Sequence, residues 1–143
     1  MRVALGHSFL TDVVRLDFLL PVPGRDVFAL SHGLVAAIVA GVSLVLEIPG
    51  TEVGGAPVYG DGFPAIMLFD DVPGGGGVVA RLEEPTVLRS VLEHARDRLN
   101  GSCGCGPDGS CYACLRTYRN QSLHSDLRRG LVYDYLNHIL EHF

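Results

Sequence analysis

The sequence predicts an α+β fold: a small sheet packed with about three helices, plus a four-cysteine knuckle between the last two helices. Two short apolar segments have the length and pattern of strands, three longer segments have helical patterns, and all four cysteines lie between residues 103 and 114. With 143 residues, 48% of them hydrophobic, the chain has enough apolar material for one domain, residues 1–143, with its own core.

The N-terminal segment, residues 3–20, predicts one or two strands. Val14, Leu16 and Phe18 alternate with charged residues, which is the period of a strand with one buried face. Prolines and glycines follow directly and end the segment.

An uncharged apolar segment, Val27–Leu46, predicts a buried helix with its cap at Asp26 or Ser31 and its end before Pro49. Its length is about that of a membrane span. Polar residues and glycines interrupt the segment, and no arginine cluster flanks it. The sequence therefore favours a core helix and no membrane association.

The second half of the chain supplies the remaining elements. Residues 50–64 contain five glycines and two prolines and predict a surface loop, and Ala65–Phe69 is a short apolar run typical of a buried strand. Residues 85–99 and 125–142 carry apolar side chains at helical spacing with charged residues on the other face. Both segments predict amphipathic helices.

Composition excludes one class of function and indicates a compartment. The net charge is −5, and all 11 basic residues are arginine. Without lysine, the chain cannot form the Gly-Lys-Ser/Thr phosphate loop of a self-sufficient P-loop ATPase. Nothing at the N-terminus resembles a signal peptide, and the cysteines are clustered rather than dispersed. These features predict a cytoplasmic protein.

The cysteine cluster predicts a structural zinc site. Cys103, Cys105, Cys111 and Cys114 form Cys-x-Cys and Cys-x-x-Cys pairs separated by five residues, with glycine, proline and serine between the ligands. Zinc prefers four soft ligands in a tetrahedron, and four thiolates leave no open position for water or substrate. Spacing alone leaves three alternatives open: two disulfides, a redox pair at Cys111 and Cys114, and an iron–sulfur cluster.

A glycine-rich turn is the second candidate site. Asp70 and Asp71 precede four consecutive glycines, Gly74, Gly75, Gly76 and Gly77. The carboxylates suit a divalent cation, and the backbone amides of such a turn suit a phosphate. Acids followed by proline and glycine are also ordinary turn chemistry, and the sequence favours this structural interpretation.

An arginine-rich segment is the third candidate site. Residues 115–129 carry four arginines against one acid, with tyrosine, asparagine and glutamine nearby. Arginine suits phosphate recognition, and tyrosine stacks on bases. A solvated surface with arginines paired to acids explains the segment equally well. The candidate nucleic-acid-binding residues are Arg116, Arg119, Asn120, Arg128 and Arg129.

Taken in order, these motifs resemble a known family. Thr11–Val14, the segment Phe69–Gly77, the four cysteines and Leu115–Gln121 before a last helix are similar to the MrfA-like zinc-binding domain. That family occurs at the C-termini of bacterial superfamily 2 DNA helicases that resemble the repair helicase MrfA, and in a component of the DISARM anti-phage defence system. The resemblance implies Zn²⁺ at the four cysteines and a helicase domain as partner, in cis or in trans.

The resulting expectation is a non-catalytic zinc accessory domain that works with a DNA helicase in DNA repair or anti-phage defence, by docking and by weak DNA binding. Two alternatives stand beside it. One is a metal-dependent hydrolase or nuclease that uses Asp70 and Asp71. The other is a protein–protein adaptor with no nucleic-acid role.

Overall fold

The computed structural model describes residues 3–7, 13–21, 26–59, 63–71 and 77–143. Its sheet has four antiparallel strands in the order β1-β2-β4-β3. The strands are β1 Val3–His7, β2 Val13–Phe18, β3 Val53–Val58 and β4 Ala65–Asp70.

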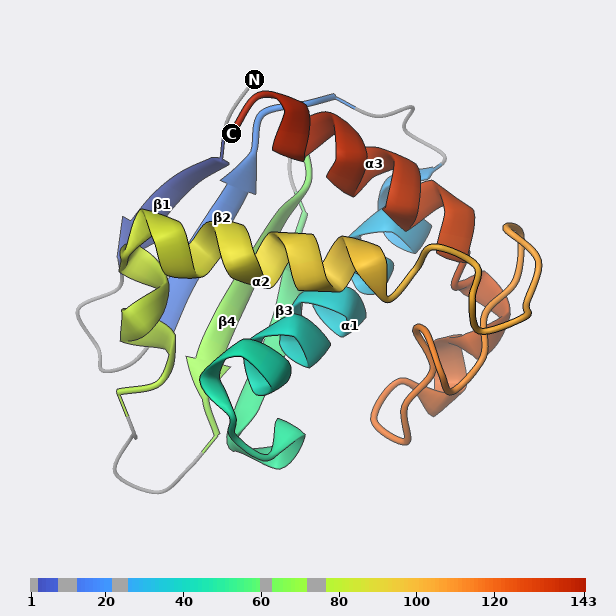
Figure 1. Ribbon diagram of the computed structural model, residues 1–143, viewed down its shortest axis with the longest axis horizontal. Coiled ribbons are helices and arrows are strands. Elements are labelled where there is room, and N and C mark those ends of the chain that lie inside the picture. Colours follow the sequence, from blue (N-terminus) through green and yellow to red (C-terminus); the bar gives the residue numbers. More distant parts are fainter. Residues whose placement is uncertain (1–2, 8–12, 22–25, 60–62, 72–76) are drawn as a thin grey trace.

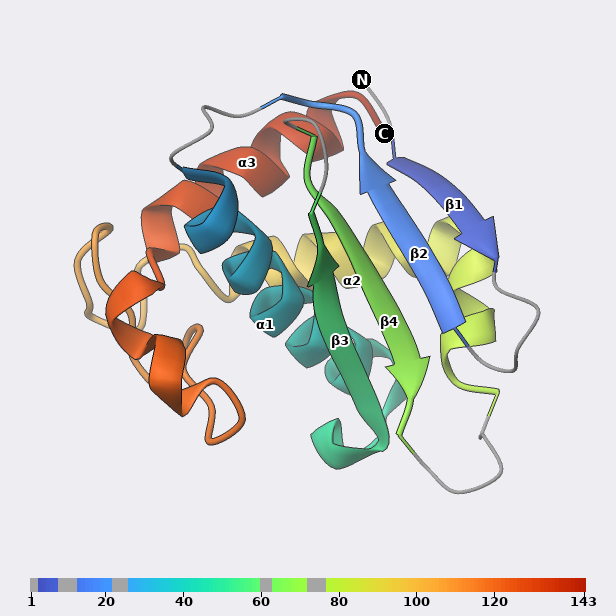
Figure 2. The ribbon, with the colours of Figure 1, turned by 180° about the vertical axis from the view of Figure 1, so that it is seen from behind.

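Three α-helices and three short 3-10 helices complete the described fold. The α-helices are α1 Val27–Leu46, α2 Pro85–Asp97 and α3 Arg129–Glu141. The 3-10 helices are η2 Gly50–Glu52, η3 Val79–Glu83 and η4 Gln121–Asp126. The α-helices lie on one side of the sheet, with α2 crossing in front of the strands in Figure 1 and the strands nearest the viewer in Figure 2. This arrangement confirms the predicted α+β fold class.

The core lies between the sheet and the helices. β2 contributes Val14, Leu16 and Phe18, all at most 1% exposed, in the alternation that the sequence predicts. Helices α1, α2 and α3 bury apolar residues against the same core. Burial of this apolar surface supplies most of the driving force for folding.

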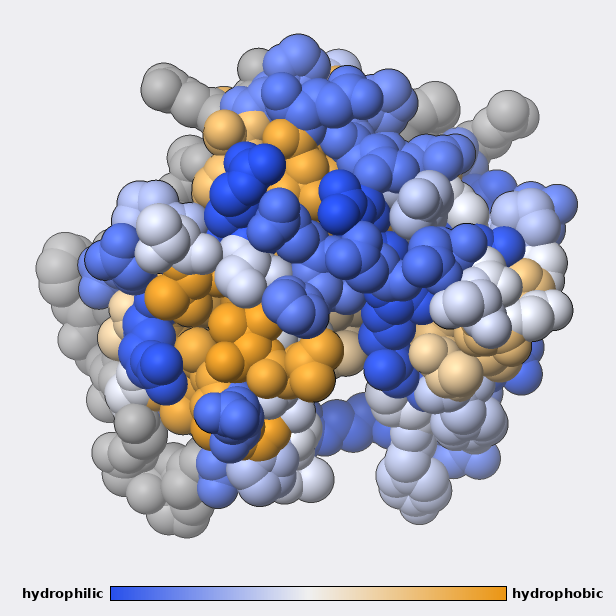
Figure 3. All heavy atoms as spheres, viewed as in Figure 1, coloured by the Kyte–Doolittle hydropathy of each residue, from blue (hydrophilic) through white to orange (hydrophobic). Residues whose placement is uncertain are grey.

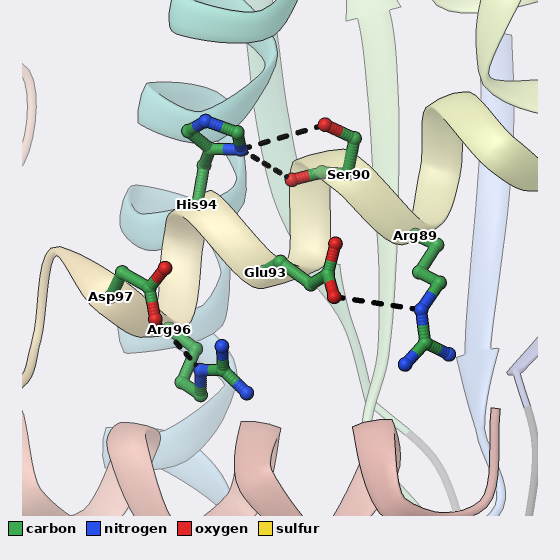
Figure 4. Close-up of polar contacts among 6 residues, drawn as sticks. All are labelled: Arg89, Ser90, Glu93, His94, Arg96 and Asp97. Carbon is green, nitrogen blue, oxygen red and sulfur yellow. Dashed lines mark hydrogen bonds and ion pairs between the residues drawn. The ribbon is translucent and has the colours of Figure 1, made fainter.

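The outer face of α2 is solvated. Arg89 and Glu93 pair at 3.5 Å, and the Nε of Arg96 bonds Asp97 at 2.9 Å. His94 Nδ1 lies 2.8 Å from the carbonyl oxygen of Ser90 (Figure 4). Surface ion pairs contribute at most about 1 kcal/mol each, so α2 is held mainly by its apolar face.

The prediction of a surface loop over residues 50–64 was wrong, because this segment contains β3. β3 is an edge strand, where Pro57 is tolerated because a missing N–H breaks no ladder bond on the outer side. Gly54 leaves room for the Phe69 ring of β4, since an added Cβ would lie 2.5 Å from it. The glycine and proline content therefore reflects close packing and an edge position rather than a loop.

The predictions for the first and the last helix need smaller corrections. Asp26 precedes α1 but makes no side-chain capping bond, and Ser31 lies buried inside the helix. The last helix begins at Arg129 rather than Ser125, because η4 occupies the preceding residues.

Helix α1 is long and apolar enough to cross a membrane by length and composition. In the fold, 56% of its most apolar window is buried. It packs against β3 and α2, as the sequence favours for a core helix.

Candidate metal centre

Glycine and asparagine at the end of α2 lead the chain into the cysteine knuckle, residues 103–114. Asn100 Oδ1 accepts a bond from the Ser102 N–H at 2.9 Å, and Gly101 has a φ of +96°. Gly104, between the first two cysteines, has a φ of +91°. Residues with a Cβ rarely adopt this conformation, so these glycines make the sharp turns possible.

The second cysteine pair closes a tight turn. The carbonyl of Cys111 accepts backbone bonds from Cys114, Leu115 and Arg116, at 2.9–3.1 Å. Cys114 and Leu115 are at most 2% exposed and belong to the hydrophobic core. This end of the knuckle is thereby fixed to the domain.

The four sulfur atoms fit a tetrahedral metal site. They lie within 4.8 Å of one another, with neighbouring separations of 3.3 Å for Cys103–Cys105, 3.6 Å for Cys105–Cys114 and 3.7 Å for Cys111–Cys114. A tetrahedron with Zn–S bonds near 2.3 Å requires about 3.8 Å between sulfurs. The donor set and its geometry therefore fit Zn²⁺.

The disulfide alternative does not fit this geometry. All four cysteines are free thiols, and the shortest sulfur separation is 3.3 Å. A disulfide requires about 2 Å.

The thiols differ in acidity before a metal binds. Hydrogen bonds from the backbone and side chain of Cys105 lower the pKa of Cys103 to about 7. Burial raises the pKa of Cys114 to about 12, and burial also raises the pKa of Cys105. Coordination requires thiolates, so a metal ion must displace these protons.

Three arginines surround the knuckle. Arg98 Nε donates to the carbonyl of Cys114 at 2.9 Å, and Arg116 Nε donates to Ser110 Oγ at 2.9 Å. Arg129, at the start of α3, donates to the carbonyls of Leu99 and Cys105 at 2.8 and 3.0 Å. Arg129 is 9% exposed, a position that does not suit a phosphate contact.

The other candidate nucleic-acid-binding residues also make internal contacts. Arg119 donates to the carbonyls of Val53 and Thr51 at 2.9 and 3.1 Å and pairs with Asp71 at 3.2 Å. Asn120 Nδ2 donates to the carbonyl of Leu115 at 2.8 Å. Arg128 pairs with Asp26 at 2.6 Å. Whether any of them contacts DNA stays a prediction.

The aspartates of the glycine turn have structural partners. Asp70 accepts bonds from the backbone N–H groups of Val78 and Val79, at 3.0 and 2.9 Å, and so holds the start of η3. Asp71 pairs with Arg119. Gly77 has a φ of +69°, whereas Gly74, Gly75 and Gly76 lie outside the described residues.

A cleft of about 1550 Å³ separates α1 and β3 from the segment that follows the knuckle. Leu44 of α1 and Tyr118 of that segment are 63% and 85% exposed. Hydrophobic surface gathers on the α1 side of the cleft in Figure 3. No sequence pattern predicted this cleft, although its α1 wall is part of the uncharged apolar segment. The lining includes Val35, Ala36, Val39, Ala40 and Leu44 of α1, Gly54–Pro57 of β3, and Thr117, Tyr118, Arg119, Asn120 and Leu123.

The fold and the site together define a class: an α+β module whose last two α-helices are joined by a four-thiolate metal knuckle. A sequence model of the MrfA Zn-binding domain matches residues 34–115, which is more than half of the chain and includes all four cysteines. The chain belongs to this family, and it is a zinc-binding domain of the kind associated with MrfA-type helicases.

A solved structure shows the same fold. It is described as the crystal structure of the DUF1998 helicase MrfA bound to DNA, and it matches with a TM-score of 0.62 and 16% identity. The match covers 87% of this chain and 16% of that chain. No curated protein matches the sequence.

Proposed function

We propose that this chain is a non-catalytic accessory domain of a DNA helicase, or a separate partner of one, that acts in the bacterial cytoplasm in DNA repair or anti-phage defence. The observation that carries the proposal is a site of four converging cysteine thiols in a chain of the MrfA Zn-binding family. Four protein ligands leave the ion no position for substrate, so its role is to hold the knuckle against the domain.

The cleft between α1, β3 and the segment after the knuckle is the proposed docking surface for the helicase. Its walls expose apolar side chains such as Leu44 beside aromatic ones such as Tyr118. Exposed apolar surface of this kind is typical of interaction sites.

The docking proposal is tested by co-purification with the helicase polypeptide from the same source. Leu44→Asp and Val39→Asp are expected to reduce recovery of the complex at least tenfold, because each puts a charge into an apolar interface. Leu19→Asp is the matched control, since Leu19 is 38% exposed and does not line the cleft. Recovery unchanged by both cleft variants rules out docking through this surface.

Weak DNA binding is a second part of the proposal. Tyr118 is 85% exposed beside Arg119, whose side chain is 47% exposed despite its internal bonds. The three arginines of the segment that are not buried, Arg116, Arg119 and Arg128, would give a weak, salt-sensitive interaction. We expect a gel shift at low salt that weakens in Arg116→Ala and Tyr118→Ala but not in Arg89→Ala. A shift that is equal in all variants excludes this surface, and no shift at any salt favours the adaptor alternative.

The hydrolase alternative has less support. The two carboxylates on which it depends, Asp70 and Asp71, already bond backbone amides and Arg119 respectively. Hydrolysis of nucleic acid on addition of Mg²⁺ or Mn²⁺, lost in Asp70→Asn and Asp71→Asn, would establish it over the accessory role.

A further inference from the structure

The guanidinium of Arg129 is a buried cation. Only 9% of the residue is exposed, and its Nε has no hydrogen-bond partner. Its other two nitrogens bond only the carbonyls of Leu99 and Cys105. Removing a charge from water costs several kcal/mol, so buried charges are normally paired with an opposite charge.

No carboxylate supplies that charge within the part of the chain that the structure describes. The ion pairs there involve other arginines or His138, and Arg129 forms none. Arg98 and Arg116 also lack a carboxylate partner among the described residues, and both bond to the knuckle. Three cations therefore lie around the four cysteines, and none of the three forms an ion pair with a described carboxylate.

The site itself supplies the anion once zinc is bound. One Zn²⁺ and four thiolates carry a formal charge of 2 − 4 = −2. The Arg129 guanidinium bonds the backbone carbonyl of one ligand, Cys105, at 3.0 Å. The unpaired cation and the unpaired anion are thus neighbours.

The backbone around Arg129 is built to hold it there. Its N–H donates to the carbonyl of Gly109 at 2.9 Å, and the N–H of Gly130 donates to the carbonyl of Pro107 at 2.8 Å. Gly101 leaves space for the guanidinium, since an added Cβ would lie 3.4 Å from it. The start of α3 is therefore clamped to the knuckle on both sides of the arginine.

We propose that Arg129 is a positioning residue for the zinc site: its positive charge balances the zinc–tetrathiolate anion, with the more exposed Arg98 as a weaker second cation. This proposal rests on the zinc assignment above. It gives Arg129, at the end of the arginine-rich segment, a role directed inward, toward the metal.

The test compares zinc affinity in variants of the purified, zinc-loaded chain, by competition with a chromophoric chelator at fixed pH. Arg129→Met keeps length and apolar packing but removes the charge, and we expect zinc affinity to fall about 10- to 100-fold, as for other partners of metal ligands. Arg129→Lys keeps the charge but cannot make both carbonyl bonds together, and we expect it to retain affinity within a few-fold of wild type. The charge-transfer bands of the Co²⁺-substituted site are expected to shift in Arg129→Met and to stay unchanged in Arg129→Lys.

The matched control is Val132→Ala, a core truncation on the same helix. It is expected to lower the melting temperature while leaving zinc affinity unchanged. If Arg129→Lys loses as much affinity as Arg129→Met, or if affinity follows the melting temperature across all variants, Arg129 is merely structural and the proposal fails.

Arg98 provides a second pair of variants that does not depend on the folding of the Arg129 variants. Arg98→Met is expected to weaken zinc binding a few-fold and Arg98→Lys to restore it, because Arg98 is exposed. Equal zinc affinity in wild type, Arg98→Met and Arg129→Met overturns the proposal. A wild-type chain that binds no zinc overturns the zinc assignment itself, so the two failures are distinct.

Discussion

At the scale of single residues, Glu47 has an unfavourable conformation and an unfavourable charge position. It is the C-cap of α1 and has φ 55° and ψ 49°, in the left-handed region. It is the only residue other than glycine with a positive φ in the described part of the chain. Its negative charge also lies at the negative end of the helix dipole.

Glu47→Gly is therefore expected to raise the free energy of unfolding by about 1 kcal/mol, because glycine adopts this conformation without strain. Glu47→Gln removes the charge but keeps the Cβ, and a gain of only about 0.3 kcal/mol is expected. Chemical denaturation measures both. Equal gains in the two variants would show that the backbone conformation is not the source.

His32 makes the stability of the chain depend on pH. Burial of the imidazole lowers the pKa of His32 below 6.5. The negative charge of Asp126 acts in the opposite direction, but its effect on the pKa is smaller. Nε2 lies 2.8 Å from Tyr59 Oη. Because the unfolded chain then binds protons more readily, this contribution to stability is fully present above pH 6.5 and is lost as the pH falls from 6.5 through the lower pKa of the folded state.

His32→Gln is accordingly expected to make the melting temperature less sensitive to a change from pH 7.5 to pH 5.5 than in wild type. His138→Gln is the control, because the His138 side chain is 61% exposed. An unchanged pH sensitivity in His32→Gln contradicts the assignment of this acid sensitivity to His32.

At the scale of elements, the contact between α1 and α2 depends on one glycine. A Cβ at Gly41 would lie 2.7 Å from the carbonyl oxygen of Val91, which belongs to the backbone of α2. The sequence gives no signal for this contact, since Gly41 looks there like one interruption among several.

Gly41→Ala is expected to lower the free energy of unfolding by about 1–3 kcal/mol, because the helices must separate despite the better helix propensity of alanine. Gly50→Ala is the control, since its nearest atom would lie at 3.9 Å. Denaturation midpoints for both variants test the prediction. A Gly41→Ala variant as stable as wild type would show that α1 and α2 can shift without loss.

At the scale of the whole molecule, the knuckle is attached to the domain on two sides. Leu115, directly after the last cysteine, is 1% exposed in the core, and Arg119 bonds Val53 of the edge strand β3 and Thr51 of η2. Most side chains of the hydrophobic core come from the sheet and the three α-helices, outside the knuckle. Zinc should therefore order the knuckle and one wall of the cleft rather than the entire fold.

We expect the purified chain to contain about one zinc ion, and Cys111→Ser to lose most of it along with solubility. Removal of zinc by a chelator is expected to abolish hydrogen-exchange protection from residue 99 to 128 while β2, β4 and α1 stay protected. Loss of protection throughout the chain would show instead that the core depends on the metal.

The sequence by itself determined the fold class, the strands at the N-terminus, the long core helix and the four zinc ligands. Each of these depends on residues close together in the chain: alternation within one strand, apolar length within one helix, and ligand spacing within one knuckle. Such local patterns predict an element or a ligand set without information on which other elements pack against it.

Only the tertiary structure decided the rest. β3 is a strand because β4 pairs with it and Phe69 covers Gly54, and Arg129 is buried because α3 is clamped to the knuckle. The cleft exists because α1, β3 and the segment near Arg119 meet in space. Contacts between residues tens of positions apart create these features, so a pattern within one short segment of the sequence cannot predict them.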